Sequence, residues 1–171
     1  MRVQIGKTSA ARPEPLIWLE AGLGGSMRSW NLTFPILCRA FYCARSTRSP
    51  ILHPDEDAEV TWQSLVAEMQ AGGEKTAHHL GATFDNPLPI VLVGHSYGAM
   101  LVRVWAAWLL KSPAPSRVRP VGIVQIDPSF EGNCEGASPL YQEMERKILT
   151  WLYRGAAREQ PSFYMAWQDL Q

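Results

Sequence analysis

Apolar residues in this chain fall in short runs that alternate with amphipathic stretches. Three mostly apolar runs, Leu16–Glu20, Pro89–Val93 and Val121–Ile126, predict strands, and the last two are typical of strands covered on both faces. Residues 62–69 and 101–108 place apolar side chains at the spacing of one helix face, so they predict helices. Strands that alternate with helices favour right-handed crossovers and a doubly wound, mostly parallel α/β sheet.

Weaker signals fill the intervals between these elements. Residues 30–40 predict a short helix that contains a proline, and residues 41–44 predict a weak strand. Residues 45–56 have the composition of a loop, and Gly72-Gly73 is expected to interrupt the first long helix. A last amphipathic helix is predicted over residues 139–154.

Length and composition indicate one soluble globular unit. The chain has 171 residues, is 46% hydrophobic, and balances 16 basic against 16 acidic residues. A chain without net charge has no overall field that would attract nucleic acid. No run approaches the roughly 20 apolar residues of a membrane-spanning helix. We expect an α/β core over residues 1–136 and a helical, lid-like or C-terminal segment over residues 137–171.

Targeting and redox signals are sparse. The N-terminal residues lack the apolar core of a signal peptide, so a cytoplasmic location is expected. The three cysteines, Cys38, Cys43 and Cys134, include no CxxC pair. We therefore expect free, buried thiols, without a zinc site or a disulfide framework. No metal and no cofactor is expected.

Residues 94–98 match the pattern G-x-S-x-G, and their context is more specific than the pattern itself. An apolar run leads in and an amphipathic helix leads out, which is the strand–turn–helix of a nucleophile elbow. Such a turn lifts the Ser96 hydroxyl above the sheet, and Gly94 and Gly98 let the helix approach the strand closely. The N-terminus of that helix then favours negative charge near Ser96. The alternative is a purely structural turn.

A glycine-rich turn, AGLGGS, follows the first apolar run directly after Glu20. Gly22 and Gly24 allow a tight loop at the carboxyl end of a strand, where the crevice of an open α/β sheet lies. The backbone N–H of Leu23, together with that of Tyr97, is expected to form an oxyanion hole. Glu20 is interpreted as a brace for this loop rather than as an acid or base.

The chain resembles the α/β-hydrolase fold superfamily through LEAGLGGS-x3-W, VGHSYGAM and GIVQIDPS, over about residues 15–130. Its first motif looks like that of small ester, peptide and lactone hydrolases. The resemblance implies that Ser96 is the nucleophile and that the amides of Leu23 and Tyr97 bind the oxyanion. The expected substrate is a small ester or other acyl compound. Relatives have a D-R-x-G turn after the second strand, where this chain has residues 43–48, CARSTR.

Asp127 and His53 are the candidates for the remaining members of a catalytic triad. Asp127 follows a buried-type strand beside the one that leads to Ser96, so it is either the acid or a turn-capping residue. His53, which follows the second strand on the crevice side, is the candidate base. His95 is interpreted as a packing or hydrogen-bonding residue, and residues 78–79, both histidines, as surface residues at the far edge of the sheet.

Three hypotheses about function stay open. Relatives continue through two further strands that carry the usual acid and histidine, so the fold is expected to be incomplete at its C-terminus. The first hypothesis is a serine hydrolase of esterase type. The second is an inactive member that binds a small apolar ligand or a partner. The third is a truncated product that associates with itself through an exposed sheet edge beside residues 121–126.

Overall fold

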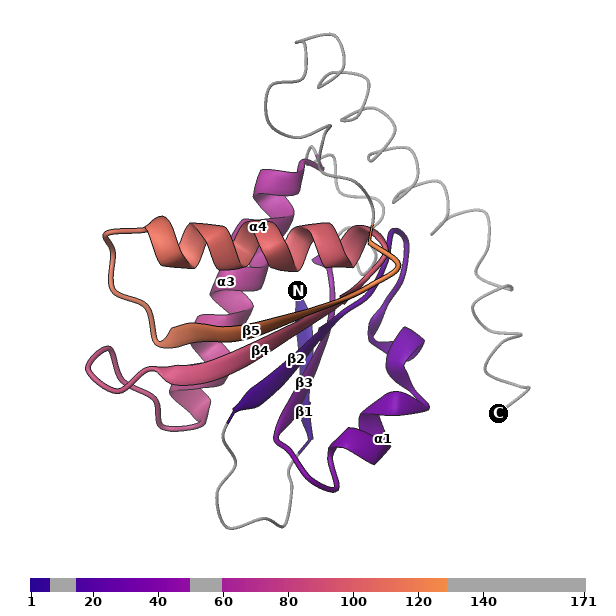
Figure 1. The fold of residues 1–171 in the computed structure, drawn as a ribbon, viewed down its shortest axis with the longest axis horizontal. Helices are drawn as coiled ribbons and strands as arrows, with labels where there is room; N and C mark the ends of the chain where they lie inside the picture. Colours follow the sequence, from indigo (N-terminus) through magenta and orange to yellow (C-terminus); the bar gives the residue numbers. More distant parts are fainter. Residues whose placement is uncertain (7–14, 50–59, 129–171) are drawn as a thin grey trace, which may run out of the picture.

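The computed structural model describes residues 1–6, 15–49 and 60–128 (Figure 1). The strands are β1 (Arg2–Gly6), β2 (Leu16–Glu20), β3 (Cys43–Thr47), β4 (Leu88–His95) and β5 (Val118–Ile126). The helices are the short 3₁₀ helix η1 (Met27–Trp30), α1 (Thr33–Leu37), α3 (Trp62–His79) and α4 (Tyr97–Lys111). The segment 137–171 lies outside the described residues, so the division into two regions stays a prediction.

The strands form one sheet in the order β1-β3-β2-β4-β5. β2 pairs in parallel with β3 and β4, and β4 pairs in parallel with β5. The predicted fold class, a doubly wound and mostly parallel α/β sheet, is therefore confirmed. The exception is β1, which pairs antiparallel with β3 and which the sequence pattern did not predict. A strand of five residues at a sheet edge has too few alternating apolar and polar positions to be recognised without its partner strand.

Helices cover both faces of the sheet, as Figure 1 shows. Successive side chains of a strand point to opposite faces, so the neighbours Trp18 and Leu19 enter different apolar clusters. The larger cluster packs under α3 and α4, and the smaller one packs under η1 and α1. The larger includes Leu16, Trp18, Leu65, Met69, Ile90, Leu92, Leu101 and Trp105, and the smaller includes Leu19, Trp30, Phe34 and Cys43.

The expected break of the first long helix at Gly72-Gly73 is wrong, because α3 runs through both glycines. A Cβ on Gly72 would lie 3.3 Å from a ring carbon of Trp18, and one on Gly73 would lie 2.7 Å from a ring carbon of Trp105. The two indole rings meet edge to face with centroids 5.3 Å apart. The glycines therefore give α3 room to approach this tryptophan pair, and burial of the helix face outweighs their low helix propensity.

Two expectations about the segment after β2 also need correction. The helix predicted over residues 30–40 is present but shorter, as α1 (Thr33–Leu37), and the 3₁₀ helix η1, which was not predicted, precedes it. The weak strand predicted over residues 41–44 extends to Thr47, into residues expected to form a loop. Pairing with β1 explains that extension, since Arg45 lies opposite Gln4 and its Nε donates to the Gln4 side-chain oxygen at 2.9 Å.

β5 lies at an edge of the described sheet, with β4 as its one neighbour. Four apolar side chains on this strand, those of Val121, Ile123, Val124 and Ile126, are each 42–47% exposed. Their exposure is unusual for a strand whose sequence is typical of burial on both faces.

Candidate active site

Ser96 occupies the junction between β4 and α4, with a backbone conformation that serine rarely adopts. Its φ of 52° and ψ of −126° lie outside the regions that L-residues favour. Hydrogen bonds hold the residue on both sides: its N–H donates to the Ile126 carbonyl at 2.9 Å, and its carbonyl accepts from the Ala99 N–H at 2.9 Å. Such a conformation costs on the order of 1–3 kcal/mol and persists where the surroundings impose it, which is common at functional sites.

Replacing Ser96 with glycine is expected to raise the free energy of unfolding by about 1 kcal/mol. Glycine adopts this conformation without a Cβ clash, and the relieved strain exceeds the entropy that glycine loses on folding. Chemical denaturation measures the change. Ser112, with φ −68° and ψ 128°, is the matched control. Its glycine variant should lose stability, and an equal loss in both variants would show that Ser96 is not strained.

Glycines bring the first turn of α4 against the strand ends. A Cβ on Gly94 would lie 2.6 Å from the Ala99 nitrogen. A Cβ on Gly98 would lie 2.7 Å from the Glu20 carbonyl oxygen and still closer to that of Ala21. These obstacles are backbone atoms, so neither position has room for a side chain. The N-terminus of α4 is thereby packed directly on the end of β2.

The glycine-rich turn after β2 lies beside Ser96. A Cβ on Gly22 would be 3.2 Å from the Ser96 Cβ, which places the loop backbone against the serine. The turn closes through a hydrogen bond from the Gly25 N–H to the Gly22 carbonyl at 3.1 Å, and Gly24 has a φ of 68°. The loop that contains Leu23 and the start of α4 at Tyr97 thus flank one serine.

A buried ion pair lies beneath this loop. The Glu20 carboxylate is 3.2 Å from the Arg48 Nε, and both side chains are only 1% accessible. The same carboxylate accepts a hydrogen bond from the Ser46 hydroxyl at 2.6 Å and one from the Trp18 indole N–H at 3.4 Å. Burial raises the pKa of Glu20 above its ordinary value, although Arg48 and the two donors oppose that shift.

Arg48 joins this pair to the loop. Its Nη2 donates to the Ala21 carbonyl at 2.7 Å and also to the Gly22 carbonyl. The guanidinium therefore holds two successive peptide units of the turn, while Glu20 compensates its charge. Planar, multidentate binding of this kind requires arginine, since lysine presents a single point charge.

Arg48 is a site residue that the sequence pattern did not reveal, whereas the bracing role of Glu20 was predicted. The pattern of residues 45–48 indicates the beginning of a loop and differs from D-R-x-G. A usable signal was present, because a glutamate at the end of an apolar strand needs a buried cation. The parallel neighbour β3 supplies one at the same edge of the sheet.

Asp127 directly follows β5, whose last residue is hydrogen-bonded to the backbone of Ser96. The preceding residue, Ile126, accepts the Ser96 N–H, and Asp127 has a positive φ of 47°. Aspartate tolerates the left-handed region better than most residues. The side chain is exposed. Its place fits both interpretations, a triad acid and a residue that shapes the turn.

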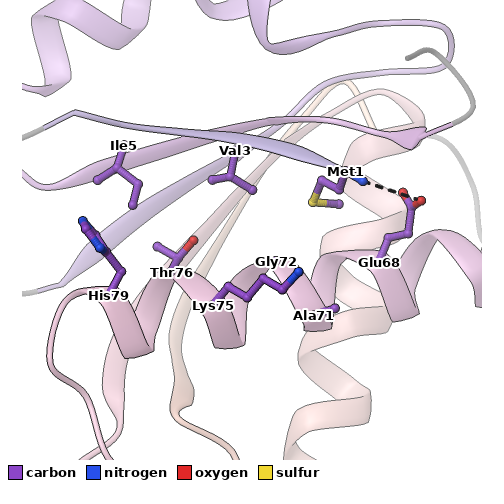
Figure 2. A pocket seen from close by; sticks show the side chains of 9 residues that line it. All are labelled: Met1, Val3, Ile5, Glu68, Ala71, Gly72, Lys75, Thr76 and His79. Atoms are coloured by element: carbon purple, nitrogen blue, oxygen red, sulfur yellow. Dashed lines mark ion pairs between the residues drawn. The ribbon is translucent and has the colours of Figure 1, made fainter. Parts of the chain in front are cut away.

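No histidine in the described part of the chain hydrogen-bonds the Ser96 hydroxyl. His95 is exposed at the end of β4, and its Nδ1 would lie 3.3 Å from a Cβ on Gly22. His78 and His79 end α3, at the amino ends of the parallel strands. His79 lines a cavity of about 310 Å³ between β1 and α3. Figure 2 shows its side chain facing that of Ile5. The candidate base His53 lies outside the described residues.

The part of the chain that the structure describes has neither a metal-binding cluster nor a membrane-spanning helix. Its histidine, cysteine and acidic side chains form no group of three or more that could hold a metal ion. None of its helices is long and apolar enough to cross a membrane.

Comparisons with known proteins find similarity in structure alone. No model of a protein family matches the chain, and neither does any curated protein. MenH from S. aureus has a TM-score of 0.54 at 10% identity over 86% of this chain and 48% of its own. A probable hydrolytic enzyme from Pseudomonas aeruginosa PAO1 has a TM-score of 0.53 at 18% identity over 74% and 36%.

A carboxylesterase from Bacillus cereus is also similar, with a TM-score of 0.51 at 14% identity over 90% of this chain and 81% of its own. The chain thus spans about half or less of the length of the first two structures. Identities this low show a shared fold. They leave the reaction and the substrate to be inferred from the residues.

Proposed function

We propose that this chain, whose fold is that of the α/β-hydrolases, is part of a serine hydrolase that acts on carboxylic esters or related acyl compounds. The observation that carries the proposal is the strained backbone of Ser96 at the strand–helix junction, with Gly22 packed against its Cβ. In a nucleophile elbow the serine stands on a strained strand-to-helix turn of this kind, next to a loop that supplies oxyanion donors. The carboxylesterase activity named for one structural neighbour belongs to the same reaction class.

The proposed reaction proceeds in two steps. The Ser96 Oγ attacks the ester carbonyl carbon while its proton passes to a base, and the carbonyl π electrons move to the oxygen. The amides of Leu23 and Tyr97 stabilise that oxyanion, which then collapses and expels the alkoxide oxygen, and the base returns its proton to that oxygen to give the alcohol. Water attacks the acyl-serine in the same way and releases the acid. Each oxyanion donor is worth about 100–1,000-fold in rate in enzymes of this kind.

His53 is proposed as the base of this chain and Asp127 as the residue that orients it. His53 is chosen for its place in the sequence, after β3, and Asp127 is supported by the hydrogen bond from the Ser96 N–H to the carbonyl of the preceding residue, Ile126. A competing candidate is an inactive binding protein of the same fold. One observation favours it: none of the three histidines in the described part of the chain hydrogen-bonds the Ser96 hydroxyl.

Labelling by a fluorophosphonate probe tests the nucleophile without knowledge of the substrate. The chain should be labelled, and Ser96→Ala should abolish labelling because the probe forms a bond to an activated serine. Ser29→Ala, at an exposed serine of η1, is the control that should retain it. No labelling of a folded wild-type chain would reject the active-hydrolase proposal, and His53→Ala should slow labelling if His53 is the base.

Self-association through β5 is proposed as a partner interaction. β5 has four half-exposed apolar side chains and a single neighbour in the described sheet. A second copy of the chain could therefore pair with this strand. Sedimentation velocity over a tenfold concentration range should show a growing dimer. Ile123→Lys should suppress it, while a monomer at all concentrations would contradict the proposal.

A further inference from the structure

Two cysteines meet on the face of the sheet that α1 covers, remote from Ser96. Cys38 ends α1, and Cys43 begins β3 five residues later. Both are free thiols, and both belong to the smaller apolar cluster. We call the five residues Gly6, Phe34, Cys38, Cys43 and Arg45 the thiol cluster.

Gly6 lies beside both cysteines. In the antiparallel pairing of β1 with β3, Gly6 lies opposite Cys43. The space in which a Gly6 side chain would stand is filled by the Cys38 sulfur and by the ring of Phe34, whose Cζ would be 2.9 Å from a Cβ. The Cys38 sulfur therefore rests on the residue paired with Cys43.

The two thiols differ in access to solvent. Cys38 is partly exposed, whereas Cys43 is completely buried and its Sγ donates to the Phe41 carbonyl at 3.6 Å. Burial, with the charge and hydrogen bonding of Cys38, raises the pKa of Cys43 to about 12. The ionisable neighbours within the thiol cluster are Cys38 and Arg45, whose guanidinium stacks 4.4 Å above the Phe34 ring.

We propose that Cys38 and Cys43 form a dithiol modification site that reacts with low-molecular-weight disulfides such as oxidised glutathione. The Cys38 thiolate attacks one sulfur of the disulfide and releases a thiolate, which gives a mixed disulfide on Cys38. Cys43 then loses its proton and attacks the Cys38 sulfur, which expels the second thiol. Two protein thiols are oxidised, one external disulfide is reduced to two thiols, and the new bond links α1 to β3.

This order of events follows from the positions of the two residues. An accessible sulfur receives the reagent, and the buried sulfur resolves the product, because attack requires access and a thiolate. Since the resolving thiol has the high pKa, the second step should accelerate as pH rises. The mixed disulfide on Cys38 is therefore expected to accumulate near neutral pH and to convert at alkaline pH.

Mass spectrometry of the full chain tests the site in a Cys134→Ser background, which leaves these two thiols alone. Treatment with oxidised glutathione should first add one glutathione and then give a product lighter than the reduced chain by two hydrogens. Peptide mapping should find Cys38 linked to Cys43. In the Cys43→Ser variant the reaction should stop at the Cys38 adduct, and in Cys38→Ser no adduct should form in the folded state.

Two outcomes would overturn the proposal. One is stable glutathionylation of both cysteines without an intramolecular bond, and the other is an oxidised chain with a lower melting temperature than the reduced one. Phenylarsine oxide gives a measurement that needs no cluster variant, because trivalent arsenic bridges two nearby thiols. It should block both thiols of the folded Cys134→Ser chain at one equivalent, and blocking only one would also reject the site.

Discussion

Replacing Arg48 with methionine is expected to lower the free energy of unfolding by about 3–5 kcal/mol. The substitution keeps an unbranched side chain but removes the charge that compensates Glu20, whose carboxylate is as inaccessible as the guanidinium. It also removes the donors to the carbonyls of Ala21 and Gly22. A buried carboxylate that loses its partner costs more than the pair contributes when intact. Urea denaturation measures the change.

Arg117→Met is the matched control for this prediction. Arg117 and Glu74 form an ion pair at 3.4 Å, but their side chains are 29% and 22% accessible. Partly exposed pairs of this kind contribute about 0–1 kcal/mol. The double variant Glu20→Gln with Arg48→Met should recover part of the loss, since no unpaired charge remains. Equal losses in Arg48→Met and Arg117→Met would show that the pair is not effectively buried.

The effect of Arg48→Met should grow with pH. Burial raises the pKa of Glu20 in the folded chain, so folding favours its protonated form. Stability associated with this group is therefore complete below the ordinary glutamate pKa and is lost as pH rises through the folded pKa. Without Arg48 the folded pKa rises further. The difference between the variant and the wild type should be smaller at about pH 5 than at about pH 8.

Gly98→Ala is expected to destabilise the chain by about 3 kcal/mol and to slow fluorophosphonate labelling by about 100-fold. The new Cβ would meet the carbonyls of Glu20 and Ala21, which are backbone atoms that cannot turn aside as a side chain can. The Ala21 carbonyl is moreover held by Arg48. Relief of the clash would move α4 away from the glycine-rich turn and so separate Tyr97 from Leu23.

Gly122→Ala is the control for that substitution. A Cβ there would lie 3.6 Å from a Val91 methyl, which is ordinary contact, so stability and labelling should change little. A melting temperature and a labelling rate for each variant decide the matter. Unchanged labelling in a folded Gly98→Ala chain would show that the contact between α4 and the loop is not needed to activate Ser96.

Some parts of the candidate site depend on local interactions, and others depend on contacts between segments distant in the sequence. The turn at Ser96 and the glycine-rich turn are local features, because the motifs G-x-S-x-G and AGLGGS each predict a backbone conformation from a few consecutive residues. Arg48 is different, since nothing in its immediate sequence distinguishes it from Arg45. Only the parallel register of β2 and β3 directs Arg48 to Glu20, whereas Arg45 reaches Gln4 and stacks on Phe34.

Apolar periodicity and glycine spacing were enough to predict the class of sheet, the serine at the strand–helix turn and the loop beside it. Both signals act within one or two neighbouring elements. Three features could be seen only in the folded chain: the antiparallel pairing of β1 with β3, the continuation of α3 through Gly72-Gly73, and the contact of Arg48 with the loop. Each depends on partners distant in the sequence, and contact with those partners outweighs the local preference of the chain.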